Sequence, residues 1–291
     1  MTIERLMVGA IDLHLHGAPE PTEGERRVNT LELAQQAKEA GMRGVVVKST
    51  RYGTGTLAML VNRLVNCPIL IGSLVLNNDA GGLNPDVVKA QAAAGAKVIW
   101  LPTFSAAAHL KTRVKAKTGD EAGKDVEDGI TIIDKNGRLV PEMEKILEVM
   151  AKNKLVLATG HVSKSEVFAV ASEALRRHTN VIITHPLAGI AGPLISIEEA
   201  KELVKMGAYI ECTFAHCMPP AILSPEKVVG YIRAIGPEHC VLSTDFGQIF
   251  NPPPTEGFHM MLATMLQFTN ISEDELNLVV KVNPAKVLGL T

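Results

Sequence analysis

The stretch IDLHLHG, residues Ile11–Gly17, follows a short apolar run that begins at Met7. His14 and His16 are two residues apart, so on a β-strand both side chains point to the same face. Neutral imidazole is a good ligand for zinc and similar cations. Two parallel imidazoles at the end of a first strand therefore indicate either the start of a metal site or a polar strand end. Residues elsewhere in the chain distinguish the two interpretations.

Beyond this stretch the chain repeats one unit: a short apolar strand, a polar loop, a capped helix, a glycine and the next strand. Capping patterns such as Ser163-x-x-Glu166 and Ser196-x-x-Glu199 open several helices, and Thr30 is the expected N-cap of the first one. The expected strands are Val8–Leu13, Gly44–Lys48, Ile69–Leu76, Lys97–Leu101, Lys154–Thr159, Val181–Thr184, Tyr209–Thr213 and Val241–Thr244.

Eight strands separated by helices predict an α/β protein with a parallel sheet, and eight such units close into a (β/α)8 TIM barrel. The alternative is an open, doubly wound sheet, but no GxGxxG motif follows the first strand. No linker rich in proline, glycine or serine divides the chain, so residues 1–291 are expected to form a single barrel domain.

The connection between the fourth and fifth strands is much longer than the others and forms an insertion after strand four, residues 104–140. It contains a basic, turn-rich part, Lys111–Lys124, and then a predicted hairpin whose turn is Asp134–Gly137. Long insertions at the C-terminal ends of strands usually form an active-site cover or an interface. The apolar hairpin is compatible with a homo-oligomer.

The composition excludes several classes of protein. Hydrophobic residues make up 46% of the chain and the net charge is −2, so no general attraction to nucleic acid or to anionic membranes is expected. No apolar run is long enough to span a membrane, and the first residues do not resemble a signal peptide. The four cysteines form no CxxC pair, which favours a reduced, cytoplasmic enzyme; Cys212 and Cys217 are expected to be buried thiols rather than ligands.

Polar side chains follow several of the expected strands. His14 and His16 follow the first strand, His161 the fifth, His185 the sixth and Asp245 the eighth. Because the strands of an α/β barrel carry the active site at their C-terminal ends, these residues are expected to meet at one mouth. Imidazoles with one carboxylate favour a divalent metal, which can lower the pKa of bound water from about 15.7 toward 7. Asp245 is the candidate general base for that water.

This pattern resembles the amidohydrolase superfamily of metal-dependent barrel hydrolases. The resemblance covers the whole chain and includes the C-terminal stretch Asn283–Leu290; it is greatest to uncharacterised amidohydrolase-like proteins, which supply no substrate. It implies that His14, His16 and His161 bind metal and that Asp245 is both ligand and general base. It also implies that His185 binds a metal or hydrogen-bonds the nucleophilic water.

One departure from the family pattern concerns the number of metals. Members with two metals carry a bridging carboxylated lysine or a glutamate at the end of strand four, whereas this strand ends Trp100–Thr103. A single zinc is therefore expected, with a second, weaker metal as the alternative if His185 or another group supplies a ligand. Glu211 lies within strand seven and is expected to be a structural, hydrogen-bonded carboxylate. Asp12, which shares the strand period of the two histidines, is expected to support the ligands from behind.

Cationic residues near the mouth are candidates for holding a small-molecule substrate. Lys48 closes an apolar strand, Arg51 follows it, and His216 lies in the loop after strand seven. The alternative for each is an ordinary solvated loop residue. His109 in the insertion is interpreted mainly as a loop residue that could also reach over the mouth.

These residues predict a metal-dependent hydrolase that cleaves a small amide, cyclic amide, lactone or ester with metal-activated water. Three alternatives stay open. The first is a metal-dependent decarboxylase of the same superfamily, in which Lys48 or Arg51 holds the substrate. The second is a phosphoesterase of the histidinol-phosphatase type, although that type has a late Asp-x-His where this chain has Asp245-Phe246-Gly247. The third is a barrel that keeps the ligands but not the activity.

Overall fold

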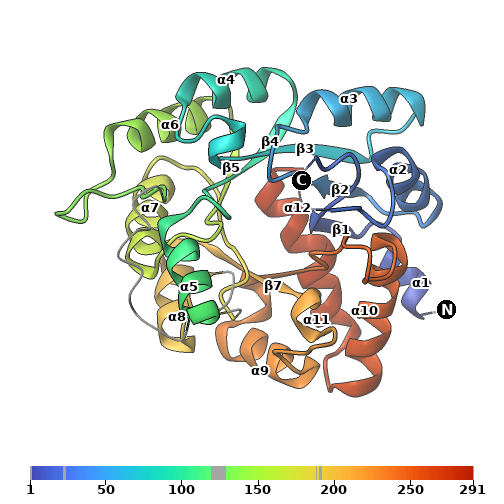
Figure 1. Ribbon diagram of the computed structural model, residues 1–291. Helices are drawn as coiled ribbons and strands as arrows, with labels where there is room; N and C mark the ends of the chain where they lie inside the picture. The colour runs from blue at the N-terminus through green and yellow to red at the C-terminus, as the bar shows by residue number, and fades with distance from the viewer. Residues whose placement is uncertain (1, 22–23, 119–128, 188, 190–191, 291) are drawn as a thin grey trace.

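The computed structural model of the protein describes residues 2–21, 24–118, 129–187, 189 and 192–290. Eight parallel strands follow one another in chain order around the sheet, and helices surround them (Figure 1). The strands are β1 (Ile11–Leu15), β2 (Gly44–Val47), β3 (Leu70–Val75), β4 (Ala96–Trp100), β5 (Val156–Ala158), β6 (Val181–Ile183), β7 (Tyr209–Thr213) and β8 (Cys240–Ser243).

The two ends of the sheet meet just beyond β1 and β8. The Asp245 N–H donates to the His14 carbonyl at 2.7 Å, and the His16 N–H donates to the Phe246 carbonyl at 2.7 Å. Leu15 and Phe246 form a parallel bridge at the same place. The predicted (β/α)8 TIM barrel is therefore confirmed, and the open doubly wound alternative is wrong.

The helices alternate with the strands, as the capping patterns predict. Ser163, Ser196 and Ser272 each form a capping box with the glutamate three residues later. The helices are α1 (Thr2–Met7), α2 (Thr30–Glu39), α3 (Gly55–Leu64), α4 (Pro85–Ala93), α5 (Ala107–Thr118), α6 (Pro141–Lys152), α7 (Lys164–Arg176), α8 (Ile197–Met206), α9 (Pro225–Ile235), α10 (Pro254–Phe268), α11 (Glu273–Asn277) and α12 (Asn283–Leu288).

The expected N-cap of the first long helix is wrong by one residue. Asn29 caps α2, because its side chain accepts the Glu32 N–H at 2.9 Å while the Glu32 carboxylate accepts the Asn29 N–H at 3.0 Å. The Thr30 hydroxyl instead donates to the Ala18 carbonyl at 2.7 Å. Thr30 therefore anchors the loop after β1 rather than the helix.

The first strand begins later than the sequence predicts. Residues Thr2–Met7 form α1, and the turn at Gly9, where φ is +81°, separates this helix from β1. The strand runs to Leu15, so His14 lies within it and not after it. The pairing also shifts: Asp12 pairs with Val45 of β2, whereas Leu15 pairs with Val47. This extra residue interrupts the alternation of side chains, with consequences for Asp12 described below.

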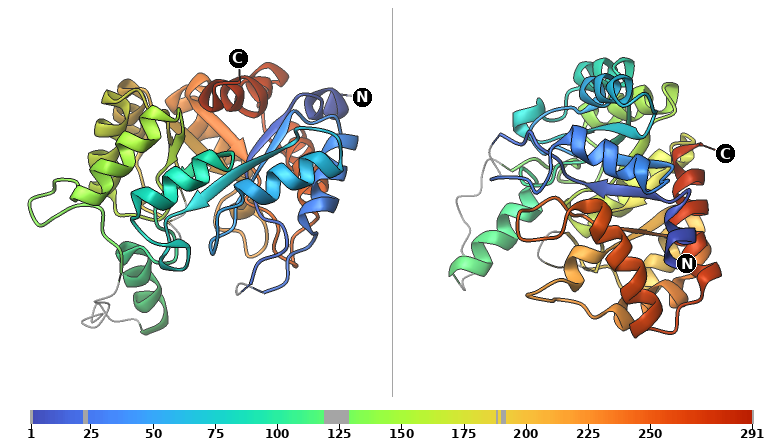
Figure 2. Two further views of the ribbon diagram at one scale, coloured as in Figure 1. Left: turned by 90° about the horizontal axis from the view of Figure 1, so that it is seen from above. Right: turned by 90° about the vertical axis from the view of Figure 1, so that its right-hand side faces the viewer.

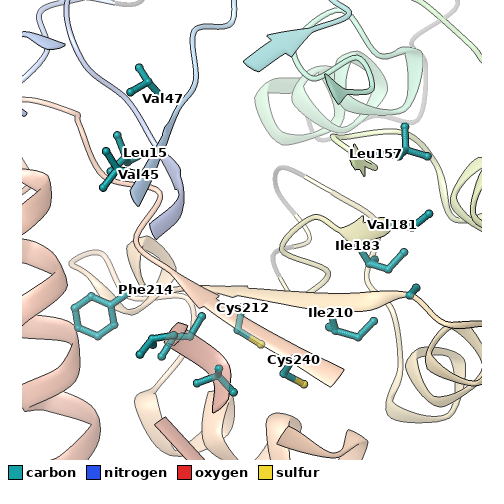
Figure 3. Packing of buried hydrophobic residues seen from close by; sticks show 14 of the residues in the cluster. Leu15, Val45, Val47, Leu157, Val181, Ile183, Ile210, Cys212, Phe214 and Cys240 are labelled. Carbon is teal, nitrogen blue, oxygen red and sulfur yellow. The ribbon is translucent and has the colours of Figure 1, made fainter. Parts of the chain in front are cut away.

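Apolar side chains fill two layers. One layer lies inside the barrel and includes Ile11, Val98 and Trp100; side chains of α12 pack against it at the end where the strands begin. The second layer lies between the strands and the helices, where Leu15, Val47 and Ile210 are among the outward-facing residues (Figure 3). The inner layer leaves the opposite end of the barrel, at the C-terminal ends of the strands, to polar side chains.

The insertion contributes a helix and a short hairpin. Residues 111–118 of its basic part are helical and form the C-terminal two thirds of α5, and residues 119–128 lie outside the described residues. The hairpin is formed: Asp134 donates its N–H to the Arg138 carbonyl at 2.7 Å, and Ile133 bridges Leu139. Figure 2 shows α5 projecting beyond the end of the barrel toward which the strand arrows point.

One glycine permits a close approach of two strand ends near the site. Gly160, just after β5, has φ +57°, and a Cβ added there would lie 2.8 Å from the Pro102 carbonyl and closer still to the Leu101 carbonyl. These obstacles are backbone atoms that cannot rotate away. Gly95 also has a positive φ, +89°, but an added Cβ would meet no described atom within 4 Å.

We expect Gly160→Ala to destabilise the fold by about 2 kcal/mol more than Gly95→Ala. Both substitutions place an alanine in a left-handed backbone conformation, but only the new Cβ at position 160 would overlap with packed backbone atoms. Urea denaturation followed by circular dichroism measures the difference. Equal unfolding free energies for the two variants would contradict the close approach.

Candidate metal centre

Three ligand-type side chains converge where β1 and β8 end. The Nε2 atoms of His14 and His16 lie 3.1 and 3.2 Å from the same oxygen, Oδ1 of Asp245. In the described part of the chain this is the one group of three or more histidine, cysteine and acidic residues whose ligand atoms all lie within 4.8 Å of one another. Ligand atoms of a tetrahedral zinc lie about 3.3 Å apart, given metal–ligand distances near 2.0–2.1 Å. The donor set and its spacing fit a divalent cation.

A carboxylate inside the barrel orients the His14 ring. Glu211 of β7 lies 3.2 Å from His14 Nδ1 and accepts a hydrogen bond from the Ser243 hydroxyl at 2.7 Å. With Nδ1 bonded to a carboxylate, the Nε2 atom of His14 faces Asp245 as a ligand atom. Glu211 thus points into the barrel and is hydrogen-bonded, as expected for a structural carboxylate.

The backbone around Asp245 is strained. Its φ is +57°, a conformation that costs energy for any residue except glycine and that often marks functional sites. Two residues later Gly247, with φ +139°, passes so close to β1 that an added Cβ would lie 2.6 Å from the Cβ of His16. The loop after β8 is therefore pressed against the histidine strand, and this contact places the Asp245 carboxylate between the two imidazoles.

Burial and neighbouring charges set the protonation of this group. Burial would raise the pKa of Asp245, but the His14 and His16 imidazoles and the Lys48 ammonium outweigh it and hold that pKa well below its usual range. In the same way His14 outweighs burial and lowers the pKa of Glu211. Burial lowers the pKa of His16, so its ring is neutral at neutral pH, as a metal ligand must be.

His161 and His185 lie beside this group without belonging to it. The His185 ring is 5.9 Å from that of His14, and the His161 ring is 5.1 Å from that of His185. Burial lowers the pKa of His185 to about 3 and holds that of His161 well below its ordinary value. His185 has φ +26°, and its Nδ1 is buried with no hydrogen-bond partner among the described residues. Both rings are thus neutral, and His185 has an atom left for a ligand.

His109 is a site residue that the sequence pattern alone favours as a loop residue. It lies on α5, is 5% exposed, and stacks on His161 with ring centroids 4.8 Å apart and Nδ1 atoms 3.1 Å apart. Phe104 packs edge-on against both rings. The available signal was the position of an apolar-flanked histidine in an insertion after a strand end. Only the fold shows that the insertion folds back onto β5.

Lys48 reaches the centre from the end of β2. Its Nζ lies 2.9 Å from His14 Nε2 and 5.1 Å from the centre of the Trp100 ring. Trp100 ends β4, so an indole lies at the strand end where the sequence resemblance led us to look for a bridging ligand. The ammonium donates to the same nitrogen that a metal would bind, and the two cations therefore compete for His14.

Asp12 does not support the ligands in the expected way. Because of the shifted register in β1, it does not share a face with His14 and His16. Its carboxylate accepts the Thr244 hydroxyl at 2.5 Å and the backbone N–H groups of Thr244 and His14 at 3.2 and 3.1 Å. Burial raises the pKa of Asp12 to about 7, although these bonds oppose it. Asp12 therefore holds the two strand backbones that carry the ligands.

A cavity of about 580 Å³ opens over the centre. His16, His161, His185 and Asp245 line it, whereas His14 is fully buried beneath. Its wall also includes His109 and Arg113 of α5, so the insertion forms one side of the cavity.

The remaining predicted substrate residues are placed differently. Lys48 and Arg51 line the cavity, and Arg51 also pairs with Asp79. The described residues that line the cavity do not include His216, which bonds to the Thr213 hydroxyl at 2.6 Å and lies 5.3 Å from the His185 ring. Cys212 is buried and Cys217 partly buried, and burial raises the pKa of both thiols, which disfavours thiolate ligands.

Comparison with known proteins places the chain by family and by fold. The model of a family of unknown function, DUF6282, matches residues 9–211, which include His14 and His185 but not Asp245. No curated protein gives a significant match. Structures with the same fold include an amidohydrolase from Pseudomonas aeruginosa, with a TM-score of 0.65 and 12% identity over 99% of this chain and 98% of that one.

Two further structures are alike over their whole length. The probable dipeptidase PvdM from Pseudomonas aeruginosa has a TM-score of 0.63 and 12% identity, covering 99% of this chain and 96% of its own. The TatD homologue YJJV from Escherichia coli K12 has a TM-score of 0.58 and 16% identity, covering 98% of this chain and 100% of its own. The resemblance to amidohydrolases seen in the sequence is thus confirmed at the level of the fold.

Replacing His109 tests whether it orients His161 as a ligand. We expect His109→Ala to weaken zinc binding about 10- to 100-fold, since removal of the group that orients a ligating histidine has this effect. Competition with a chromophoric chelator measures the affinity, and His259→Ala, an exposed histidine of α10, is the matched control. Unchanged zinc affinity in a folded His109→Ala variant would argue against this role.

Replacing Lys48 tests its competition with the metal. We expect Lys48→Met to bind zinc about tenfold more tightly than the wild type, because a positive charge next to His14 Nε2 is removed. Lys97→Met removes the same charge at the start of β4, at the opposite end of the barrel, and should leave zinc affinity unchanged. Weaker zinc binding by Lys48→Met would show that Lys48 supports the metal and does not compete with it.

Proposed function

We propose that this chain, which belongs to the DUF6282 family of unknown function, is a metal-dependent hydrolase that cleaves a small amide, cyclic amide, lactone or ester. The observation that carries the proposal is the convergence of His14 Nε2, His16 Nε2 and Asp245 Oδ1 beneath a cavity of small-molecule size. The barrel fold shared with an amidohydrolase is in keeping with it.

The metal we favour is a single zinc. Two imidazoles and a carboxylate are a common zinc donor set. The fourth ligand we propose is His185, whose ring lies 5.9 Å from that of His14, or His161, whose ring lies 5.1 Å from that of His185. Trp100 offers no bridging group, which favours one metal over two. When bound, the metal would polarise the scissile carbonyl and lower the pKa of a coordinated water.

The side chains of the cavity supply the proton transfers. Asp245 is ionised at neutral pH and its side chain is 17% exposed, so it can accept a proton from the attacking water and deliver it to the leaving group. Glu211 is 1% exposed and cannot reach substrate, which leaves it an orienting role. His185 is neutral, and its unpartnered Nδ1 can hydrogen-bond the water or the substrate oxygen. Lys48 and Arg51 hold the substrate from the β2 side, and the His216 ring packs 5.3 Å from that of His185.

Decarboxylation is the second candidate, because Lys48 places a cation next to the centre where it could hold a substrate carboxylate. A phosphoesterase of the histidinol-phosphatase type is disfavoured by the structure. That type needs a histidine at the position of Gly247, where φ is +139° and where a Cβ would collide with His16.

We further propose that the protein is cytoplasmic. The four cysteines are all free thiols, in keeping with a reducing compartment. In the described part of the chain no helix is both long and apolar enough to cross a membrane.

The test is a screen of the zinc-loaded protein against small amides, cyclic amides, lactones and esters. For whichever substrate is cleaved, Asp245→Asn should lower kcat/KM by about 10²- to 10⁴-fold, since it removes the proton acceptor. Asp86→Asn, an exposed carboxylate at the start of α4, is the control and should change nothing.

Two outcomes would overturn the proposal. Release of carbon dioxide from a carboxylic acid with no hydrolysis would establish the decarboxylase. Stoichiometric zinc with no turnover of any substrate class would indicate a barrel that keeps its ligands without catalysis.

A further inference from the structure

The cavity wall carries an excess of positive charge from three separate segments of the chain. Arg26 comes from the loop between β1 and α2, Lys48 and Arg51 follow β2, and Arg113 comes from α5. The one carboxylate among the described lining residues is Asp245, which belongs to the metal centre. Since the whole chain has a net charge of −2, this excess is local to the cavity.

We propose that the substrate carries an oxyanion, a carboxylate or a phosphate, separate from the bond that is cleaved, and that Arg26 and Arg113 bind it. This inference deepens the proposed function and rests on it, because it names the substrate class of the same cavity. Arginine suits the task, since its planar fork matches the geometry of both carboxylate and phosphate.

Arg26 is built into the cavity wall. Its side chain is only 4% exposed, and the guanidinium lies 3.6 Å from the Glu20 carboxylate, which is completely buried. Glu20 in turn accepts the Ser49 hydroxyl at 3.2 Å, so it supports Arg26 from behind and does not line the cavity. A buried arginine at a ligand cavity is costly unless a partner holds it, and this one is held in place before any ligand arrives.

The main chain fixes Arg26 relative to the metal centre as well. Arg26 forms an antiparallel bridge with Gln248, and the Arg27 N–H donates to the Gly247 carbonyl at 2.8 Å. The loop that carries Arg26 is therefore joined to the loop that carries Asp245. An anion on Arg26 would lie at a set position relative to the reacting bond, as specificity requires.

Arg113 approaches from the insertion. It is four residues after His109 on α5, so both side chains lie on the same helix face, and both line the cavity. After burial, the charge of Arg113 is a second cause of the lowered pKa of His109, about 4, which indicates that the guanidinium is near that ring. Because Arg113 is exposed, its side chain can move toward a ligand more freely than that of Arg26.

Low-dielectric cavity walls focus the field of such charges and raise the local concentration of anions. Glu20 and Asp79 offset part of the charge of Arg26 and Arg51, but both carboxylates lie outside the described lining. A divalent cation at the centre would make the cavity more positive. The field of the cavity thus favours an anionic substrate over a neutral one.

Binding of unreactive probes tests the inference without any turnover. Titration calorimetry with glutarate, its neutral diamide and inorganic phosphate is done on the zinc-loaded and the zinc-free protein, so that direct binding of the anion to the metal is separated from binding to arginine. We expect the diamide to bind at least about 100-fold more weakly than the preferred anion. A comparison of the affinities for glutarate and for phosphate shows which oxyanion the cavity prefers.

Arg26→Met and Arg113→Met should each weaken anion binding about tenfold or more. The matched controls are Arg27→Met, on the same loop but outside the lining, and Lys111→Met, an exposed cation of α5. Thermal melts show whether Arg26→Met is folded; if it is not, the exposed Arg113 decides alone.

The inference is overturned if the diamide binds as well as the anions, or if Arg113→Met and a folded Arg26→Met bind them like their controls. Anion binding that depends on arginine, in a protein that hydrolyses nothing, would uphold the inference while the hydrolase proposal fails. Hydrolysis of neutral substrates alone would uphold the hydrolase proposal and contradict the inference of an anionic substrate.

Discussion

The joint between the ends of β1 and β8 is the interaction on which both the barrel and the candidate centre depend. The two backbone hydrogen bonds between residues His14–His16 and Asp245–Phe246 close the sheet. The same bonds bring an imidazole pair and a carboxylate from opposite ends of the chain to within ligand distance. Asp12 reinforces the joint by binding the backbone on both sides. A change that loosens the joint therefore affects closure and ligand geometry together.

Burial gives this joint its electrostatic character. The neutral rings of His16 and His185 and the ionised Asp245 carboxylate lie together in a region that excludes water, and such a group gains stability from a cation. Lys48 supplies one positive charge already, at 2.9 Å from His14 Nε2. Lys48 also lines the cavity, together with the arginines. The centre and the substrate cavity are in this sense one electrostatic unit.

The sequence could predict the barrel because its evidence is local. Each strand is a short apolar run with a polar end, and each helix begins with a capping pattern that depends on residues three apart, such as Ser196 and Glu199. Since parallel strands of a barrel all point the same way, His161, His185 and Asp245 could be assigned to one mouth without knowledge of any contact. The positions of β1 and of the α2 cap were wrong by a few residues, because competing helix and cap signals lie next to each other there.

By itself, then, the sequence determined the fold, the mouth at which the chemistry lies and the kinds of ligand found there. The tertiary structure alone decided which of these side chains touch. The register shift in β1 turned Asp12 away from the histidines, and the folding back of α5 brought His109 and Arg113 to the cavity. Arg26, which in the sequence is one of several charges in a loop, became a buried cation through its contact with Glu20. The physical reason is that these placements depend on pairing between segments far apart in the chain, about which local patterns carry no information.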